Sequence, residues 1–392
     1  MFADTPLVMV KDAETLAQAA EALAKAPAIG VDTEGDSFYA YQEKVCLVQI
    51  SDLHTDYVID PLAVRDLSPL APIMANRDIV KIFHGADYDV VCMKRDFGFA
   101  FHNIFDTMLA SQLVGLPKVG LADIIGQFFG HDIEKKYQRH DWGKRPLYNE
   151  HVDYARGDSH WLPALREILL RRLEDLDRTH ILDEECLILE DREWVGKPFD
   201  ELGFYTMKGA KGLSDNEFKI LRQLYLYRDE QARKLDRPTF KVISDRDLVL
   251  VAKGQPTTAD ALDEALPGRQ GLKRRHAAKL VEVVNRALTE DEPLPKRKKK
   301  PAKEKKPPGR LRGKAADRAF EHIKGWRNDA MKADPDLPHA ATLSNGTIKA
   351  IVRARPTSLA ELTAVEGVRK WQVDAYGDTV LSLLDEVDED NA

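Results

Sequence analysis

The first acidic cluster of this chain comes directly after a short apolar run. Ala28–Val31 is typical of a buried strand, and Asp32 and Glu34 follow it with one residue between them. Residues i and i+2 of a strand share a face, so both carboxylates point to the same side. Two like charges side by side are costly unless a cation joins them. The pair is therefore a candidate cation site, although acidic pairs also occur on ordinary exposed strands.

A second cluster combines the end of a predicted strand with the start of a predicted helix. Asp78–His84 is rich in β-branched residues and Gly85 follows it, which predicts a strand and then a turn. Asp87 is typical of an N-cap, the residue that begins a helix. Asp89 then lies in the first helical turn and becomes a second candidate ligand, while His84 is expected to be a packed side chain.

The third cluster is a tyrosine and an aspartate on a predicted helix. Tyr154 and Asp158 are four residues apart and share one helix face, where a hydrogen-bonded surface pair is the simpler alternative. Together the clusters supply four acids and a phenol from a strand end, a helix start and a later helix. Mg²⁺ and Mn²⁺ prefer carboxylate oxygens, and two ions about 4 Å apart need several convergent carboxylates. The combination predicts a two-ion metal centre.

The order and spacing of these blocks resemble the DEDD exonuclease family, in its tyrosine-bearing subclass. The whole layout resembles ribonuclease D, with some likeness to the exosome-associated nuclease of eukaryotes. A further block before the last cluster adds to the resemblance: Lys135-Lys136-Tyr137-Gln138, then Asp141-Trp142, then Arg145-Pro146-Leu147.

Two positions separate this chain from other members of that family. The histidine-bearing subclass has a histidine five residues before its last acid, where this chain has Asp153. Many members carry a bulky residue after the first acidic pair, where this chain has Gly35. Phe38, Tyr39 and Tyr41 are candidates to supply the stacking surface instead.

The resemblance implies an α/β ribonuclease H-like catalytic domain with a mixed sheet and the activity of a 3′–5′ exoribonuclease. The implied substrate is RNA, in the 3′ processing of tRNA or other structured RNA, and the products are 5′-mononucleotides. Two Mg²⁺ or Mn²⁺ ions would be held by Asp32, Glu34, Asp89 and Asp158, with Asp32 bridging them and Tyr154 orienting the attacking water. Lys135, Gln138, Trp142 and Arg145 are expected substrate contacts. Lys135, Lys136 and Arg145 are the candidates to bind backbone phosphate, although an exposed basic face is the commoner meaning of such residues.

Two other functions stay open at this stage. A catalytically silent RNA-binding scaffold would keep the fold and lose one of the four acids, and all four are present here. A DNA-directed 3′–5′ exonuclease uses the same site, although tandem helical modules favour RNA. A helicase is excluded because the sequence has no GxxxxGK[ST] phosphate loop.

Val45–Ser51 and Tyr57–Asp60 are two further strand candidates. Helical periodicity replaces the strand patterns from about Thr179 onward. The best example is Glu217–Lys234, which Ser214 precedes in a capping-box pattern. Thr239–Leu262 and Ala340–Leu362 align at an offset of 100 residues, which indicates two copies of one module. The module resembles the domain shared by ribonuclease D and the RecQ helicases. Lys273, Arg274, Arg275 and Lys279 make the first copy the better candidate for contacting RNA.

We therefore expect two all-α helical-bundle domains behind the catalytic domain. The expected boundaries are 1–175 for the exonuclease domain, 176–211 for a connecting segment, 212–291 and 316–386 for the two modules, 292–315 for a linker and 387–392 for an acidic tail. The linker segment Pro293–Lys314 holds eleven Lys or Arg residues, five prolines and one Glu. Such a composition predicts an extended tether, either a spacer or a non-specific phosphate contact.

Composition narrows the setting of the protein. The net charge is −7, so the basic tether is hidden within an acidic chain. No apolar run approaches the roughly 20 residues that span a bilayer, and the first residues lack the pattern of a signal peptide. The three cysteines (Cys46, Cys92 and Cys186) are scattered, which predicts buried thiols in a reducing compartment. We predict a cytoplasmic monomer with RNA as its partner and no membrane.

Overall fold

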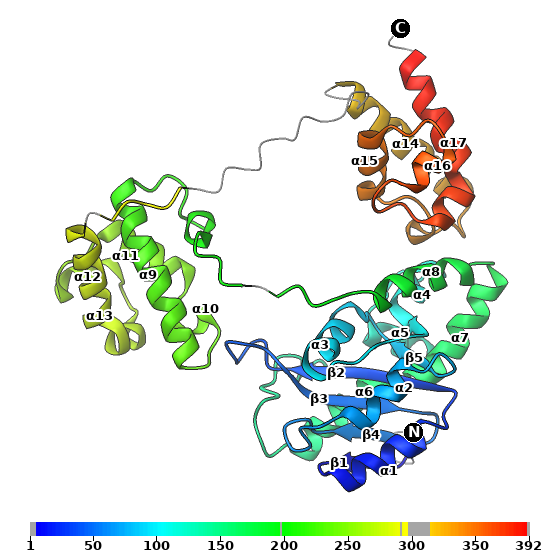
Figure 1. Cartoon of the computed structure of the whole chain (residues 1–392), viewed down its shortest axis with the longest axis horizontal. Helices are drawn as coiled ribbons and strands as arrows, with labels where there is room; N and C mark the ends of the chain where they lie inside the picture. Colours follow the sequence, from blue (N-terminus) through cyan, green and yellow to red (C-terminus); the bar gives the residue numbers. More distant parts are fainter. Residues whose placement is uncertain (1–4, 197, 291, 297–313, 390–392) are drawn as a thin grey trace. The chain divides into compact units, whose positions relative to one another are not determined.

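The computed structural model describes residues 5–196, 198–290, 292–296 and 314–389 (Figure 1). It divides into two compact units. One unit contains residues 5–35, 45–194 and 314–389, and the other contains residues 36–44 and 195–296. Most of the predicted basic tether and the end of the acidic tail lie outside the described residues.

A six-stranded mixed sheet forms the centre of the first unit, in the order β1-β4-β3-β2-β5-β6. β3 runs antiparallel to β2 and β4, and the other neighbouring pairs are parallel. The predicted mixed α/β architecture is confirmed, and β1 and β6 were not predicted. The strands are β1 (Leu7–Val10), β2 (Ala28–Gly35), β3 (Val45–Ser51), β4 (Asp56–Ile59), β5 (Val80–Phe83) and β6 (Ile104–Asp106).

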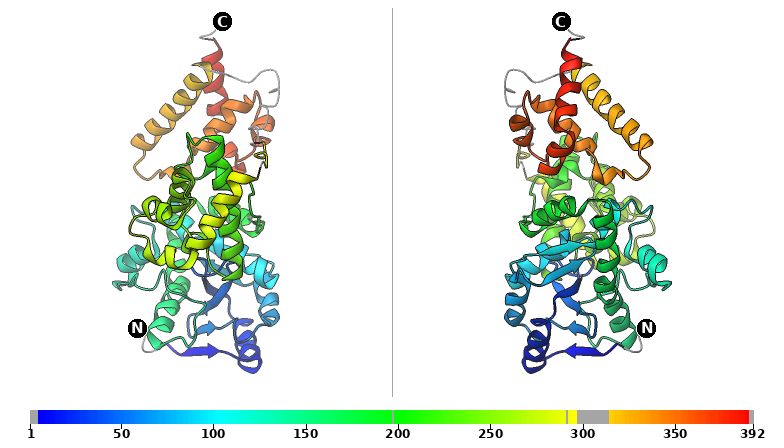
Figure 2. Two further views of the ribbon diagram at one scale, coloured as in Figure 1. Left: turned by 90° about the vertical axis from the view of Figure 1, so that its left-hand side faces the viewer. Right: turned by 90° about the vertical axis from the view of Figure 1, so that its right-hand side faces the viewer.

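Helices cover both faces of this sheet (Figure 2). They are α1 (Ala13–Leu23), α2 (Ala71–Ala75), α3 (Asp87–Phe97), α4 (Thr107–Leu113), α5 (Leu121–Phe129), α6 (Asn149–His160), α7 (Leu162–Asp175) and α8 (Thr179–Glu190), with a 3₁₀ turn, η2 (Ser68–Leu70). β2 packs closely against the junction of α6 and α7 because Gly30 has no side chain. A Cβ atom at Gly30 would lie 2.6 Å from the carbonyl oxygen of Ser159. This approach brings the acids of β2 beside those of α6.

α8 packs against the core of the catalytic domain. Its apolar face, which includes Ile181, Leu182 and Cys186, joins the same buried cluster as the sheet residues. The helix lies within the predicted connecting segment of residues 176–211, so the first part of that segment buries apolar surface. Cys46, Cys92 and Cys186 are buried free thiols, as predicted.

The second unit holds the first helical module. Its helices are α9 (Asp215–Lys234), α10 (Thr239–Val242), α11 (Asp245–Gly254), α12 (Ala259–Ala265) and α13 (Gln270–Thr289), preceded by η3 (Gly203–Thr206). The predicted capping box is present, since Ser214 Oγ accepts from the amide of Glu217 and the Glu217 carboxylate accepts from the amide of Ser214. The loop of residues 36–44, between β2 and β3, belongs to this unit. Tyr41 Oη donates to the Asp229 carboxylate at 2.7 Å.

The second helical module repeats the first, which confirms the predicted duplication. It consists of α14 (Lys314–Ala333), α15 (Asn345–Ala354), α16 (Leu359–Thr363) and α17 (Lys370–Glu389), with η4 (His339–Ala341). Ser244 and Ser344 cap equivalent helices. The buried Arg228 and Arg327 each donate to a backbone carbonyl just before that cap, Ile243 O and Leu343 O.

The second module packs against the catalytic core within the first unit. The Glu184 carboxylate of α8 accepts from the backbone amides of Lys370 at 2.6 Å and Trp371 at 2.9 Å, at the start of α17. An acid at a helix N-terminus satisfies amides that have no partner within the helix. Throughout the described ranges, every helix is too short or too polar to span a bilayer.

Candidate active site

Three of the predicted acids converge in the first unit. Asp32 and Glu34 come from β2 and Asp158 from α6, and one carboxylate oxygen of each lies within 4.8 Å of the other two. We call these three side chains the carboxylate cluster. Among the described residues, none of the three makes an ion pair with a Lys, Arg or His side chain. Their negative charges therefore face one another without a protein cation.

Asp89 lies beside this cluster and is held separately. Its carboxylate accepts a hydrogen bond from Thr33 Oγ1, between the two acids of β2. Asp87 was predicted to be the N-cap of α3, and this prediction is wrong. Ala86 holds that position, and Asp87 pairs with Arg192 at 3.0 Å. The turn before α3 is instead held by Asp106, whose carboxylate accepts from the Gly85 and Ala86 amides at 3.1 and 2.8 Å.

Burial raises the pKa values of all four acids, and repulsion from other members of the group adds to the rise for Asp32, Glu34 and Asp158. Loss of hydration is the largest cause for each of them. The pKa of Asp158 rises to about 7, with the charge of Asp89 adding to the effect of burial. The pKa of Asp89 rises to about 6 although the Thr33 hydrogen bond opposes the shift. A divalent cation bound among these carboxylates would offset their repulsion and favour their ionised forms.

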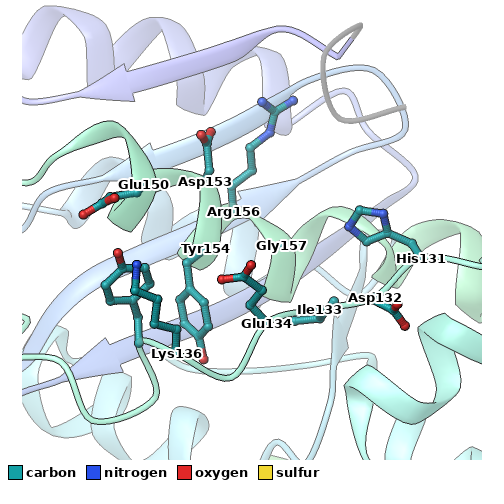
Figure 3. A pocket seen from close by; sticks show the side chains of 11 residues that line it. His131, Asp132, Ile133, Glu134, Lys136, Glu150, Asp153, Tyr154, Arg156 and Gly157 are labelled. Atoms are coloured by element: carbon teal, nitrogen blue, oxygen red, sulfur yellow. The ribbon is translucent and has the colours of Figure 1, made fainter.

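Tyr154 stands next to these acids on α6. Its ring stacks on Trp142, with centroids 6.0 Å apart, and meets Tyr137 edge-on at 5.7 Å. Burial raises the pKa of the phenol above its ordinary value, and the charges of Asp158, Glu34 and Asp32 raise it further. Tyr154 projects from α6 away from Asp153 and Arg156 (Figure 3). The phenol therefore stays protonated at neutral pH and can donate a hydrogen bond.

The comparisons with known proteins agree with this geometry. Residues 7–174 match the model of the 3′–5′ exonuclease family, and residues 217–284 and 316–384 each match the HRDC domain. The solved catalytic core of RRP6 from Trypanosoma brucei is 30% identical, covers 74% of this chain and 81% of its own, and superposes with a TM-score of 0.67. This chain belongs to the ribonuclease D-like family of 3′–5′ exonucleases.

Two curated relatives share much of this sequence. Ribonuclease D of Desulfotalea psychrophila is 29% identical over 72% of this chain and 76% of its own length. Protein RRP6-like 3 of Arabidopsis thaliana is 33% identical over 66% of this chain, which spans 32% of that larger protein. The expected family and the tandem arrangement of helical modules are both confirmed.

A hollow of 560 Å³ opens beside Tyr154 in this ribonuclease D-like site (Figure 3). Apolar and aromatic surface comes from Ile133, Tyr137 and Tyr154. Four acids also line it: Asp132, Glu134, Glu150 and Asp153. Arg156, on its wall, is already paired with Asp56 at 2.5 Å. Lys136 also lines the hollow, but the four acids outnumber it, so the hollow suits a base or sugar better than a phosphate group.

The predicted substrate contacts fall into two groups. Lys135 and Gln138 are exposed and accessible to a ligand. Trp142 is only 1% exposed and packs with Val152 and Ala155, so it supports α6 from within the fold. The structure offers its ring no route to RNA.

Arg145 is engaged by the protein itself. Its guanidinium donates two hydrogen bonds to the Asp60 carboxylate, from Nε at 2.6 Å and from Nη2 at 2.7 Å. The remaining donors reach the carbonyls of Trp142, Lys144 and Cys46. These bonds argue against the predicted phosphate contact, because Arg145 ties the loop before α6 to the sheet. The sequence showed the arginine but gave no indication of its buried partner, which is 85 residues away.

The basic residues of the first HRDC module are also partly engaged. Lys273 is 9% exposed and pairs with Asp263 at 2.6 Å, and Lys279 pairs with Glu282 at 2.5 Å. Arg274 and Arg275 are exposed. Lys273 is therefore withdrawn from the predicted basic surface, and Arg274, Arg275 and Lys279 remain exposed on it. His84 is partly buried and lies 3.0 Å from Thr107 Oγ1, in keeping with the predicted packed role.

Proposed function

We propose that this chain hydrolyses RNA from the 3′ end with two Mg²⁺ or Mn²⁺ ions held by Asp32, Glu34, Asp89 and Asp158. The observation that carries the proposal is the convergence of the carboxylate cluster without a protein cation to neutralise it. A cluster of this kind in a 3′–5′ exonuclease domain has a ready explanation in metal binding.

The residues present fit divalent ions. Members of this family depend on divalent metals, and carboxylate oxygens are the donors that Mg²⁺ and Mn²⁺ prefer. We assign Asp32, Glu34 and Asp158 to one ion, with Asp32 shared and Asp89 serving a second. When bound, such ions lower the pKa of a coordinated water and stabilise the negative charge of the phosphate and the leaving oxygen.

The other side chains hold and orient the reactants. Tyr154 keeps its proton because its pKa is raised, so it orients the attacking water by a hydrogen bond and does not act as a base. Thr33 keeps Asp89 beside the cluster. The apolar side of the hollow next to Tyr154 receives the terminal nucleoside, and hydrolysis releases 5′-mononucleotides.

RNA is the substrate that the relatives support best, because they include ribonuclease D and RRP6-like proteins. We propose tRNA precursors or other structured RNAs with free 3′ ends as the targets. Lys135 and Gln138, together with Arg274 and Arg275 of the first module, are the exposed side chains offered as contacts. A cytoplasmic location and a monomeric state stay predictions.

A single assay tests the activity and the metal requirement together. The purified chain is incubated with a 3′-tailed tRNA and with a DNA oligomer of the tail sequence, in Mg²⁺, Mn²⁺ or EDTA, and the products are resolved by length. We expect stepwise shortening of the RNA, and no shortening in EDTA. Asp32→Asn should lower the rate by at least about 10²-fold, since metal ions contribute several kcal/mol of transition-state stabilisation.

Asp87→Asn is the matched control, because Asp87 is exposed and lies two residues before Asp89. It should retain the activity of the unmodified chain. Full activity in Asp32→Asn would contradict the metal centre. Degradation of the DNA alone would contradict the assignment of RNA as substrate.

A further inference from the structure

One buried amide in the catalytic domain has no hydrogen-bond partner at either end. Gln49 lies on β3 and is 0% exposed, and neither its Nε2 nor its Oε1 atom has a partner. Among the described residues it is the only Asn or Gln side chain in this condition. A buried amide left unpaired destabilises a folded chain. Hydrogen bonds within the chain therefore do not explain why an amide is buried at this position.

The register of the sheet places this amide directly beside Asp32. Gln49 pairs with Asp32 across β2 and β3. Side chains of directly opposed residues in antiparallel strands share a face, with their Cβ atoms about 4.5–5.5 Å apart. Asp32 belongs to the carboxylate cluster, so the nearest ionisable neighbour across the strands is a proposed metal ligand.

The same face is covered by α6. Ser51, two residues along β3 from Gln49, lies with its Oγ 2.8 Å from Ser159 Oγ of α6. Leu47, two residues the other way, packs in a buried cluster with Trp142 and Ala155. Alternation along the strand directs Gln49 to this same side. Its amide is thus enclosed between Asp32 and the helix that carries Tyr154 and Asp158.

We infer that Gln49 is a positioning residue for the metal site: its amide N–H donates to the Asp32 carboxylate, or to a water bound with it, when a divalent ion is held there. The inference rests on the proposed function. A neutral donor suits this place, because it fixes the direction of a carboxylate oxygen without adding a positive charge that would compete with the ion. A Lys or Arg at the same position would neutralise Asp32 and weaken cation binding.

The inference gives Gln49→Met an unusual pair of effects. Methionine has a similar length and removes both polar atoms. The metal-free protein should be as stable as the unmodified chain, or more so, because the orphaned amide is gone. Affinity for Mn²⁺ should fall by about 10–100-fold, the usual result of removing a group that orients a metal ligand. Thermal unfolding in EDTA and titration of Mn²⁺ by electron paramagnetic resonance measure the two effects separately.

Ser51→Ala is the matched control on the same face of the same strand. It removes the hydrogen bond to Ser159 and should lower the melting temperature in EDTA while leaving Mn²⁺ affinity unchanged. Gln49→Met should show the opposite pattern. If Gln49→Met unfolds, or loses thermal stability in EDTA, the amide has a structural partner and the inference is overturned. Unchanged Mn²⁺ affinity overturns it as well.

Asp32→Asn, titrated in parallel, separates this inference from the proposed function. If Asp32→Asn loses Mn²⁺ and Gln49→Met does not, only the role of Gln49 fails. If neither variant loses Mn²⁺, the metal centre itself is contradicted. If both lose it and the melting temperature of Gln49→Met in EDTA is preserved, both stand.

Discussion

The catalytic domain contains two kinds of buried acid, which differ in whether a cationic side chain of the protein pairs with them. Asp56 is 1% exposed and accepts from Arg156 Nε at 2.5 Å and from His160 Nδ1 at 2.9 Å. Asp60 is gripped by Arg145 in the same manner. The carboxylate cluster has no such cation among the described residues. The acids that pair with a cationic side chain hold loops and helices to the sheet. The acids of the carboxylate cluster are available to a cation from outside the chain.

The pKa of Asp56 and the pKa values of the carboxylate cluster move in opposite directions. Burial alone would raise the pKa of Asp56, but hydrogen bonds from His160, Ser51 and Arg156 outweigh it and the pKa falls below its ordinary value. Burial raises the pKa of Asp158 as well, and there the charge of Asp89 adds to it. Burial therefore disfavours the ionised form of both carboxylates. Hydrogen bonds reverse this effect at Asp56, and the charge of Asp89 reinforces it at Asp158.

Removing the cation from the paired acid should have the largest effect on stability. Arg156→Met leaves Asp56 buried with His160 and Ser51 as its remaining partners. Breaking a buried pair by deleting one partner costs about 3–5 kcal/mol, and we expect the lower end because His160 remains. The free energy of unfolding in urea at pH 7.5 measures the change.

Lys25→Met provides the reference for that measurement. Lys25 pairs with Glu21 on the surface at 2.8 Å, with both side chains more than 70% exposed. An exposed pair contributes about 0–1 kcal/mol, so this variant should be close to the unmodified chain. Equal losses in the two variants would show that Asp56 does not depend on its partner.

The proposed metal ligands were more predictable from the sequence than the paired acids. Asp32 and Glu34 are adjacent in a strand pattern, and Tyr154 and Asp158 are adjacent on a helix face, so local periodicity placed them. Asp56 and Arg156 are 100 residues apart and follow no short motif. Arg145 was interpreted as a phosphate contact for the same reason: its partner Asp60 belongs to a distant strand end. Gln49 also went unnoticed, because an amide inside an apolar strand has meaning only once the register is known.

The fold shows the same boundary between local and distant information. Val45–Ser51 was predicted to the residue, since a continuous apolar run between polar segments leaves little choice. β1 and β6 were missed, because strands of four and three residues carry too short a pattern and form only by pairing with a neighbour already in place. The core contacts of α8 were not predicted, because they come from the sheet, far back in the chain.

Removing a charge from the unpaired cluster should have a smaller effect of opposite sign. Asp158→Asn relieves repulsion within the cluster, so the metal-free protein should gain about 1 kcal/mol, the energy of roughly one pKa unit. Urea unfolding in EDTA at pH 7.5 measures the gain. Added Mn²⁺ should stabilise the unmodified chain and leave the variant almost unchanged. A loss of stability in EDTA would mean that Asp158 is already neutralised within the fold.

The pH dependence of stability also separates the two kinds of acid, and its sign is defined. The ordinary pKa of Asp158 is 3.8 and its pKa in the folded chain is about 7. Between these values the unfolded chain releases a proton that the folded chain retains, so this group favours unfolding more strongly as the pH rises from about 4 to 7. Asp56 acts in the other direction: its pKa is lowered, so its contribution is present above pH 3.8 and is lost as the pH falls below that value.

Melting temperatures in EDTA should therefore decline from pH 5 to 7.5, and the decline should be shallower in Asp158→Asn. Mn²⁺ should reverse the slope for the unmodified chain, because ion binding requires ionised carboxylates. Identical profiles in EDTA and in Mn²⁺ would remove the distinction between the two kinds of acid.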